Sequence, residues 1–135
     1  GSFDYGIFQA VQLAAIIAMR EGDNHIEEQA LIYEKRRDVL VQGLQKLGWE
    51  VESPRATMFV WAKVSPEHLA PFGGSASEFC MAMVDQAEVA MTPGSAFGDL
   101  GEGCVRLALV ENEQRIKQAI RQLQRVLAKP AATVG

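Results

Sequence analysis

The spacing of apolar residues changes along this chain from a helical period to a strand period and back. Over residues 25–47, apolar side chains recur at three- and four-residue steps, which is typical of an amphipathic helix that ends at Gly48. Residues 49–52 and 58–64 are instead rich in aromatic and branched side chains and flank Ser53 and Pro54, which predicts a hairpin of two strands. A chain that carries both periods is expected to fold as helices packed on a sheet.

Three further segments have the marks of helices. Residues 7–20 are apolar nearly all round and rich in helix formers, which predicts a buried helix. Ser75 and Glu78 have the spacing of a capping box, so a helix is expected to begin there. Asn112 is a favourable N-cap for the last helix, which we expect to end before Pro130.

Two more strands complete the predicted fold. They are expected near residues 88–91 and over residues 104–110, with turn-rich loops at residues 65–74 and 93–98. The resulting order is two helices, two strands, a helix, two strands and a helix. This is an α+β fold, with helices packed on a small mostly antiparallel sheet. We expect one domain over residues 1–130 and a frayed tail over residues 131–135.

Composition narrows the class of protein. The chain has 135 residues, with 13 basic and 17 acidic side chains, and it lacks the basic stripe that nucleic-acid-binding domains carry. Its longest strongly apolar run, residues 11–19, is too short to span a bilayer, and no secretory signal is visible. Cys80 and Cys104 lie in apolar patterns, which indicates buried, reduced thiols. We therefore expect a cytoplasmic protein that binds neither nucleic acid nor membrane.

Candidate catalytic residues are few. His25 and His68 have no serine or cysteine partner at a recognisable spacing, so both are expected to be solvated histidines. Gly98, Gly101 and Gly103 do not open a helix, which argues against a dinucleotide-binding motif. Neither a catalytic residue nor a metal site is predicted.

Arg106 is the exception, because it interrupts an apolar strand. Strand alternation places it on the face opposite Val105 and Leu107, among small or apolar neighbours. A guanidinium stays charged at any accessible pH and is rarely buried without a partner. One interpretation is a salt bridge to a distant acid such as Glu52 or Glu88. The other is a fork that binds a carboxylate or phosphate through two parallel hydrogen bonds. The pattern leaves both open.

Four stretches resemble one family, in the same order along the chain. They are "GSFDYGIFQAVQLAAI", "YEKRRDVLVQGLQKLGWEVESP", "MFVWAKV" and "PGSAFGDLGEGCVRLALVENEQRIKQAI". Together they resemble the carboxy-terminal small domain of the class I/II aminotransferases, which are pyridoxal-phosphate (PLP) enzymes of fold type I. Within that family the chain is most similar to the bacterial glutamate–pyruvate (alanine) aminotransferases, with LL-diaminopimelate and methionine aminotransferases as near relatives.

The resemblance implies roles for particular residues. Arg106 occupies the position of the arginine that binds the α-carboxylate of the amino-acid substrate. Pro93, Gly94 and Phe97 belong to a loop that should border the substrate pocket, and Tyr5 belongs to a segment near the subunit interface and the cofactor. The full-length enzyme would be a homodimer. It would use PLP to move an amino group between an L-amino acid, alanine or glutamate, and a 2-oxo acid.

The same resemblance implies that part of the site lies outside this sequence. In the family, the Schiff-base lysine and the aspartate that pairs with the pyridine nitrogen lie upstream of the "FDYG" segment. The lysines of this chain match no such motif: Lys35, Lys46, Lys63, Lys117 and Lys129. We therefore expect a small domain without its N-terminal cofactor domain, which by itself binds no PLP and is not catalytic. The alternatives are a stand-alone carboxylate-binding module and a non-catalytic dimerisation unit.

The chain departs from the family pattern in the predicted hairpin. Ala56 and Thr57 precede Met58 where many members of the family have glycine. The resemblance therefore implies an altered turn at this point.

Overall fold

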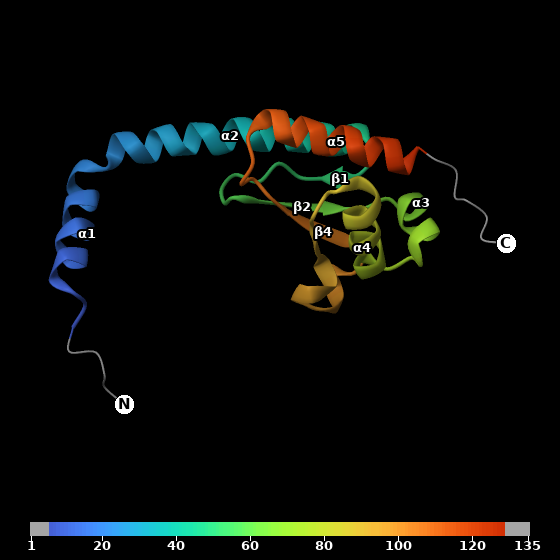
Figure 1. The fold of residues 1–135 in the computed structure, drawn as a ribbon, viewed down its shortest axis with the longest axis horizontal. Helices are drawn as coiled ribbons and strands as arrows, with labels where there is room; N and C mark the ends of the chain where they lie inside the picture. The colour runs from blue at the N-terminus through green and yellow to red at the C-terminus, as the bar shows by residue number, and fades with distance from the viewer. Residues whose placement is uncertain (1–5, 129–135) are drawn as a thin grey trace. The chain divides into compact units, whose positions relative to one another are not determined.

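A computed structural model describes residues 6–128. Contacts divide the chain into two units, one ending at Ile32 and the other starting at Tyr33, so that helix α2 belongs to both. Eight elements follow the predicted order, and all of them but β3 are labelled in Figure 1: α1 (Gln9–Glu21), α2 (Asp23–Lys46), β1 (Glu50–Val51), β2 (Phe59–Lys63), α4 (Ala76–Ala87), β3 (Thr92–Pro93), β4 (Cys104–Ala108) and α5 (Glu113–Leu127). The α+β fold is confirmed.

The first unit contains α1 and the start of α2. The predicted helix is present, but the prediction that it is buried is wrong for the chain as described. No residue of α1 is buried, and Phe8 and Met19 beside and within it are 75% and 76% exposed. A helix that is apolar all round needs partners on several sides, and the first unit offers only the opening turns of α2.

The second unit begins in the middle of α2, whose Leu40, Val41 and Leu44 are buried. The helix ends as the sequence predicted. Gly48 adopts a left-handed conformation with φ 83°, and the next amide, Trp49 N–H, donates to the Leu44 carbonyl over 3.2 Å. These contacts satisfy carbonyl groups at the end of the helix.

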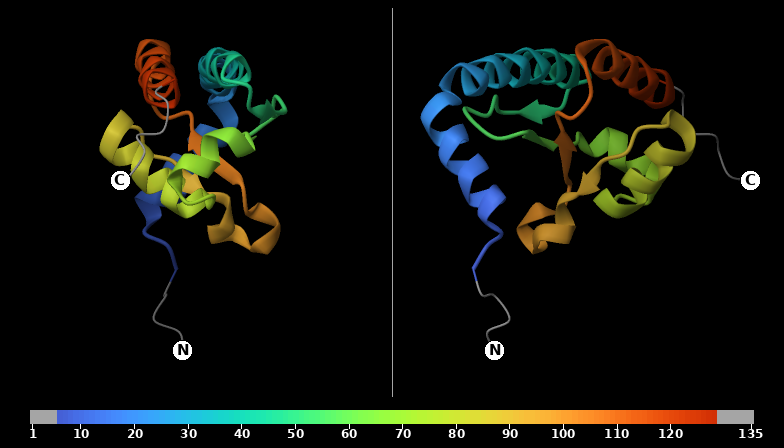
Figure 2. Two further views of the ribbon diagram at one scale, coloured as in Figure 1. Left: turned by 90° about the vertical axis from the view of Figure 1, so that its right-hand side faces the viewer. Right: turned by 60° about the vertical axis from the view of Figure 1, so that its left-hand side comes forward.

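The four strands form one antiparallel sheet in the order β1-β2-β4-β3. One face of it is buried, with Val60 and Ala62 from β2 and Val105 and Leu107 from β4 in the core. The end of α2 and helices α4 and α5 contribute the rest of that core. Figure 2 (left) shows α2 and α5 side by side above the sheet. The opposite face of β2 and β4 carries Arg106, so the second unit has two layers with one open sheet face.

The predicted N-cap residues Ser75 and Asn112 are confirmed, but only the serine half of the capping box is found, since no bond from the Ser75 amide to the Glu78 carboxylate forms within residues 6–128. Ser75 Oγ accepts from the Glu78 amide over 3.2 Å, and Asn112 Oδ1 accepts from the Arg115 amide over 3.0 Å. Both bonds satisfy amides that the first turn of a helix leaves free. The apolar stripe of α5 is also confirmed, with its members buried or partly buried in the core: Ile116, Ala119, Ile120, Leu123, Val126 and Leu127.

Two predictions of local structure are wrong. The strand expected near residues 88–91 lies instead at Thr92–Pro93, because Glu88 takes up a left-handed conformation (φ 53°) that ends α4. Residues 65–74 are not a plain loop. They form helix α3 (Pro66–Leu69) and a 3-10 turn (Ala70–Phe72), each with a proline in its first turn. Proline presets the φ angle of a helix start, so the residues that suggested a loop also open short helices.

Thr57 carries backbone strain in the connection between β1 and β2. Its φ is 77°, a left-handed conformation that costs a residue with a Cβ about 1–2 kcal/mol. Glycine avoids that cost, but it gives the unfolded chain more conformational freedom, which lowers the free energy of unfolding by about 0.4–1 kcal/mol. We expect Thr57→Gly to raise the free energy of unfolding by up to about 1 kcal/mol, measured by urea denaturation.

The matched control for this prediction is Gly48, which has φ 83° and open space where a Cβ would lie. Gly48→Ala should lower the free energy of unfolding, because it introduces the strain that Thr57→Gly removes. A decrease in stability for Thr57→Gly would contradict the assignment of strain at this turn.

Candidate functional site

Arg106 lies on the open face of strand β4. Val105 and Leu107 on either side of it are buried in the core, while Arg106 itself is half-buried. The predicted alternation of the strand is therefore confirmed. In the antiparallel register, Arg106 is opposite Trp61 of β2 on one side and opposite Thr92 of β3 on the other.

Aromatic rings surround the guanidinium of Arg106. Its Cζ lies 4.3 Å from the centroid of the Phe59 ring and 4.6 Å from that of the Phe97 ring. Its one polar contact among the described residues is long, with Nη2 3.5 Å from Thr92 Oγ1. Both ring distances are in the range of cation–π attraction. The guanidinium is held mainly by apolar surfaces, and most of its N–H donors have no partner within the described part of the chain.

No acid neutralises this charge among residues 6–128. The salt bridge to Glu52 or Glu88 that the sequence left open is not formed, and the Glu88 carboxylate accepts a hydrogen bond from Gln122 over 3.3 Å instead. An unneutralised guanidinium with free donors is suited to bind a planar anion such as a carboxylate.

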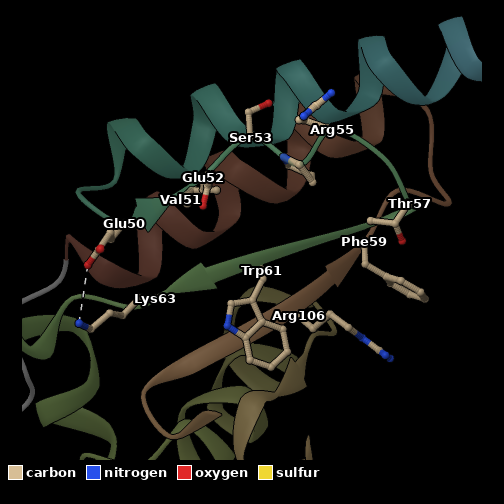
Figure 3. Close-up of a pocket in the computed structure, with 11 residues that line it drawn as sticks. Glu50, Val51, Glu52, Ser53, Arg55, Thr57, Phe59, Trp61, Lys63 and Arg106 are labelled. Atoms are coloured by element: carbon tan, nitrogen blue, oxygen red, sulfur yellow. Dashed lines mark ion pairs between the residues drawn. The ribbon is translucent and has the colours of Figure 1, made fainter. Parts of the chain in front are cut away.

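A pocket opens beside Arg106 over β2 and the connection that precedes it. Figure 3 shows Arg106 and Trp61 next to each other, with Phe59 further along β2. Two more cations line the pocket, Arg55 and Lys63. Lys63 is exposed and lies 3.7 Å from Glu50 in an ion pair. Of these three cations, Arg106 is the one for which the described chain gives contacts with aromatic rings.

The sequence also indicated Pro93, Gly94, Phe97 and Tyr5 for the substrate pocket. Phe97 touches Arg106, as described above. Pro93 pairs with Val105 in the sheet, and Gly94 is buried, with no room for a side chain because an added Cβ would lie 2.2 Å from the Gly101 carbonyl oxygen. None of Pro93, Gly94 and Phe97 is among the residues that line the pocket next to Arg106. Tyr5 lies outside the described residues.

Sequence reasoning missed Phe59 and Trp61. Both belong to the segment that was predicted as a strand, and strand alternation alone places them on the face opposite Val60 and Ala62. That pattern was available as a signal. The sequence did not indicate the register that sets Trp61 opposite Arg106, because this register pairs two strands that lie far apart in the sequence.

The histidines lie away from Arg106. His25 is exposed, as predicted. The prediction for His68 is wrong, because it is half-buried and its Nδ1 accepts a hydrogen bond from Trp49 Nε1–H over 3.0 Å. Ser65 Oγ lies 2.9 Å from the same nitrogen. These contacts tie α3 to the core and give His68 a structural role.

The cysteines and acids of the described residues suggest no further chemistry. Cys80 is buried as predicted, and burial raises the pKa of its thiol to about 11, so this thiol stays protonated and unreactive. The prediction that Cys104 is buried is wrong, because it is half-buried. Residues 6–128 hold no group of three His, Cys, Asp or Glu side chains that could bind a metal ion. None of the helices described is long and apolar enough to cross a membrane.

The lysines of the described residues do not fit a PLP site. PLP chemistry needs a lysine for the Schiff base and an acid beside the pyridine nitrogen. Lys35, Lys46 and Lys117 are exposed on helices, Lys63 is in its ion pair with Glu50, and Lys129 lies outside the described residues. Residues 6–128 thus hold an arginine suited to bind an anion but no lysine whose placement fits the Schiff base.

Glu102 ties the loop that carries Phe97 to helix α4. Its Oε1 accepts from the Ala76 amide over 2.7 Å and from the Gly103 amide over 3.2 Å. The bond from Ala76, followed by that from Gly103, lowers the pKa of Glu102 below its ordinary value. The carboxylate therefore stabilises the fold above the unfolded-state pKa of about 4.3, and this contribution is lost as the pH falls through the lower folded-state pKa.

We expect Glu102→Gln to lower the melting temperature at pH 7, with the difference from the unchanged chain shrinking as the pH falls below about 4. The measurement is a thermal melt across this pH range. Glu111→Gln is the control, because Glu111 is exposed and makes no side-chain hydrogen bond within residues 6–128. A difference for Glu102→Gln that grows toward low pH would contradict the assignment.

Fold and site together define a class of domain: a two-layer α+β unit with a candidate anion site on the open face of its sheet. A family model, aminotransferase class I and II, matches residues 4–123. The chain belongs to this family and corresponds to the carboxy-terminal small domain of its members.

Individual relatives carry aminotransferase names, in agreement with the family match. The chain is 46% identical to a putative aminotransferase, AatC, of Rhizobium meliloti, over 97% of this chain and 32% of that protein. It is also 46% identical to the glutamate-pyruvate aminotransferase AlaC of Escherichia coli (90% and 29%), and 42% identical to an LL-diaminopimelate aminotransferase of Halothermothrix orenii (91% and 30%). The chain thus spans about three tenths of the length of these relatives.

Solved structures show the same fold. The apo structure of BacF from Bacillus subtilis matches with a TM-score of 0.80 at 28% identity, over 95% of this chain and 31% of that one. An aminotransferase from Staphylococcus aureus matches with a TM-score of 0.78 at 28% identity, over 90% and 31%.

Proposed function

We propose that the full-length protein is a PLP-dependent aminotransferase and that Arg106 binds the α-carboxylate of its amino-acid substrate. The observation that carries this proposal is the half-buried guanidinium of Arg106, which meets two aromatic rings and no acid among the described residues. Membership of the aminotransferase family supports the reaction class.

The role of Arg106 is to bind and to orient. A guanidinium and a carboxylate pair through two parallel hydrogen bonds, which fix the carboxylate in one plane. The α-carbon is then held at a set position, so that its C–H bond can be aligned for proton removal. The cofactor supplies the electron sink for this chemistry when it is bound. Since residues 6–128 offer no fitting lysine, we propose that another part of the full-length enzyme holds PLP and that the present chain alone does not catalyse transamination.

The substrate pair that we propose is L-alanine or L-glutamate with a 2-oxo acid. The 46% identity to a glutamate-pyruvate aminotransferase supports this choice, while the LL-diaminopimelate aminotransferases at 38–42% identity support a second candidate. A homodimer in the cytoplasm is the assembly and location that the family resemblance predicts.

The test is an assay of the purified full-length protein with PLP and 2-oxoglutarate, using L-alanine and LL-diaminopimelate as alternative amino donors. We expect turnover with L-alanine and none by the 135-residue chain alone. Higher kcat/KM with LL-diaminopimelate would transfer the proposal to the second substrate. Carboxylate binding without any turnover by the full-length protein would favour a non-catalytic binding module.

A further inference from the structure

The charge of Arg106 does not by itself explain why its side chain is held in one conformation. Arginine has a long side chain with many rotamers, and a site that binds a carboxylate at two points needs one of them. Salt bridges to acids usually supply such order, yet no acid pairs with Arg106 within the described residues. The contact with Thr92 Oγ1, at 3.5 Å, is too long to hold the guanidinium.

Two phenylalanines supply the missing order. Phe59 stands on β2 and is paired with Ala108, two residues from Arg106 along β4, which brings its ring 4.3 Å from Cζ. Phe97 comes from a different element, the 3-10 turn Gly94–Phe97, and its ring lies 4.6 Å from the same atom. The Phe97 ring in turn packs edge-on against Trp61, with centroids 5.6 Å apart and planes at 68°.

Rings and acids hold an arginine in chemically different ways. A carboxylate partner would occupy the in-plane N–H donors and cancel the charge, so the arginine could no longer bind a second carboxylate well. An aromatic ring attracts the cation through its quadrupole and takes up no N–H donor. An aromatic ring also adds surface of low polarity, beside which the electrostatic interaction with an anion is stronger than in open water.

We infer that Phe59 and Phe97 are positioning residues that hold the Arg106 guanidinium in its binding conformation while leaving its charge and its N–H donors free for the substrate carboxylate. This inference rests on the proposed function, since it concerns the same arginine. Phe97 is 54% exposed, so within this chain it contributes little buried surface, and its contacts are with Arg106 and Trp61.

The experiment is a set of steady-state measurements on the full-length enzyme carrying Phe59→Leu, Phe97→Leu or Phe97→Tyr. Each leucine variant should raise KM for the amino donor by roughly three- to thirtyfold, with a smaller effect on kcat. Phe97→Tyr keeps the ring and should restore KM to within about twofold of the unchanged enzyme. Phe72→Leu is the control, because Phe72 packs on Phe79 in the core and meets no cation in the described chain.

A second background separates this inference from the function on which it rests. The same leucine substitutions are made in Arg106→Gln, and kcat/KM is compared, with melting temperatures to verify folding. If the rings act through the guanidinium, the leucine substitutions should change kcat/KM by less than about twofold in the Arg106→Gln enzyme, which has no guanidinium at this position. An equal loss in both backgrounds, or no loss in either, would overturn the positioning role alone. An Arg106→Gln enzyme with unchanged kcat/KM would overturn the proposed function as well.

Discussion

Replacing Arg106 by alanine is expected to lower kcat/KM of the full-length enzyme about 10²- to 10⁴-fold for its amino-acid substrate. The estimate comes from two charge-assisted hydrogen bonds, each contributing about 1.5–3 kcal/mol. The guanidinium is half-buried beside the Phe59 and Phe97 rings, where hydrogen bonds to a charged group contribute more than they do in open water. The measurement is steady-state kinetics with saturating 2-oxo acid.

Two further variants make this expectation specific. Arg106→Lys keeps the positive charge but cannot form two parallel bonds, so its kcat/KM should lie between those of the alanine variant and the unchanged enzyme. Arg121→Ala removes the same charge from an exposed position on α5, the helix that covers the other face of the sheet, and should leave kcat/KM within about twofold. Equal losses for Arg106→Ala and Arg121→Ala would show that net charge, and no specific contact, matters. Unchanged binding of PLP in the Arg106 variants would separate substrate binding from cofactor binding.

The second large effect concerns the core beneath the site. Met83 on α4 is fully buried (0% exposed) in the cluster that includes Phe79. Met83→Ala should lower the free energy of unfolding by about 2–5 kcal/mol, through lost burial and the cavity that remains. Such a loss is a large share of the roughly 5–15 kcal/mol that stabilises a typical domain.

Helix α4 offers a matched control for this change. Met81 is two positions away on the same helix and is 66% exposed. Met81→Ala is the same chemical change with the same gain in helix propensity, and it should alter the free energy of unfolding by no more than about 0.5 kcal/mol. Urea denaturation of both variants measures the difference. Similar losses for both would contradict the arrangement of α4, because they would mean that its buried and exposed faces are wrongly assigned.

The predictions that succeeded concern structure that neighbouring residues decide. Asn112 caps α5 through a bond to an amide three residues on, and Gly48 ends α2 because it can take up a left-handed conformation. The alternation around Arg106 follows likewise from the geometry of a single strand. The failures at Glu88 and Pro66 are also local: Glu88 ends α4 in a left-handed conformation that glutamate seldom adopts, and Pro66 opens a short helix where proline suggested a loop.

By itself the sequence determined the type and order of the four long helices and of the strands, the N-cap residues of the last two helices and the face of β4 on which Arg106 stands. These features depend on spacings within a few residues, which the sequence displays directly. Only the tertiary structure decided that Trp61 pairs with Arg106 and that Phe59 and Phe97 both reach its guanidinium. Those contacts depend on strand register and on the path of a loop, which are set when distant segments pack into one core. The surroundings that make Arg106 a candidate binding residue therefore come from the fold, while the arginine itself is visible in the sequence.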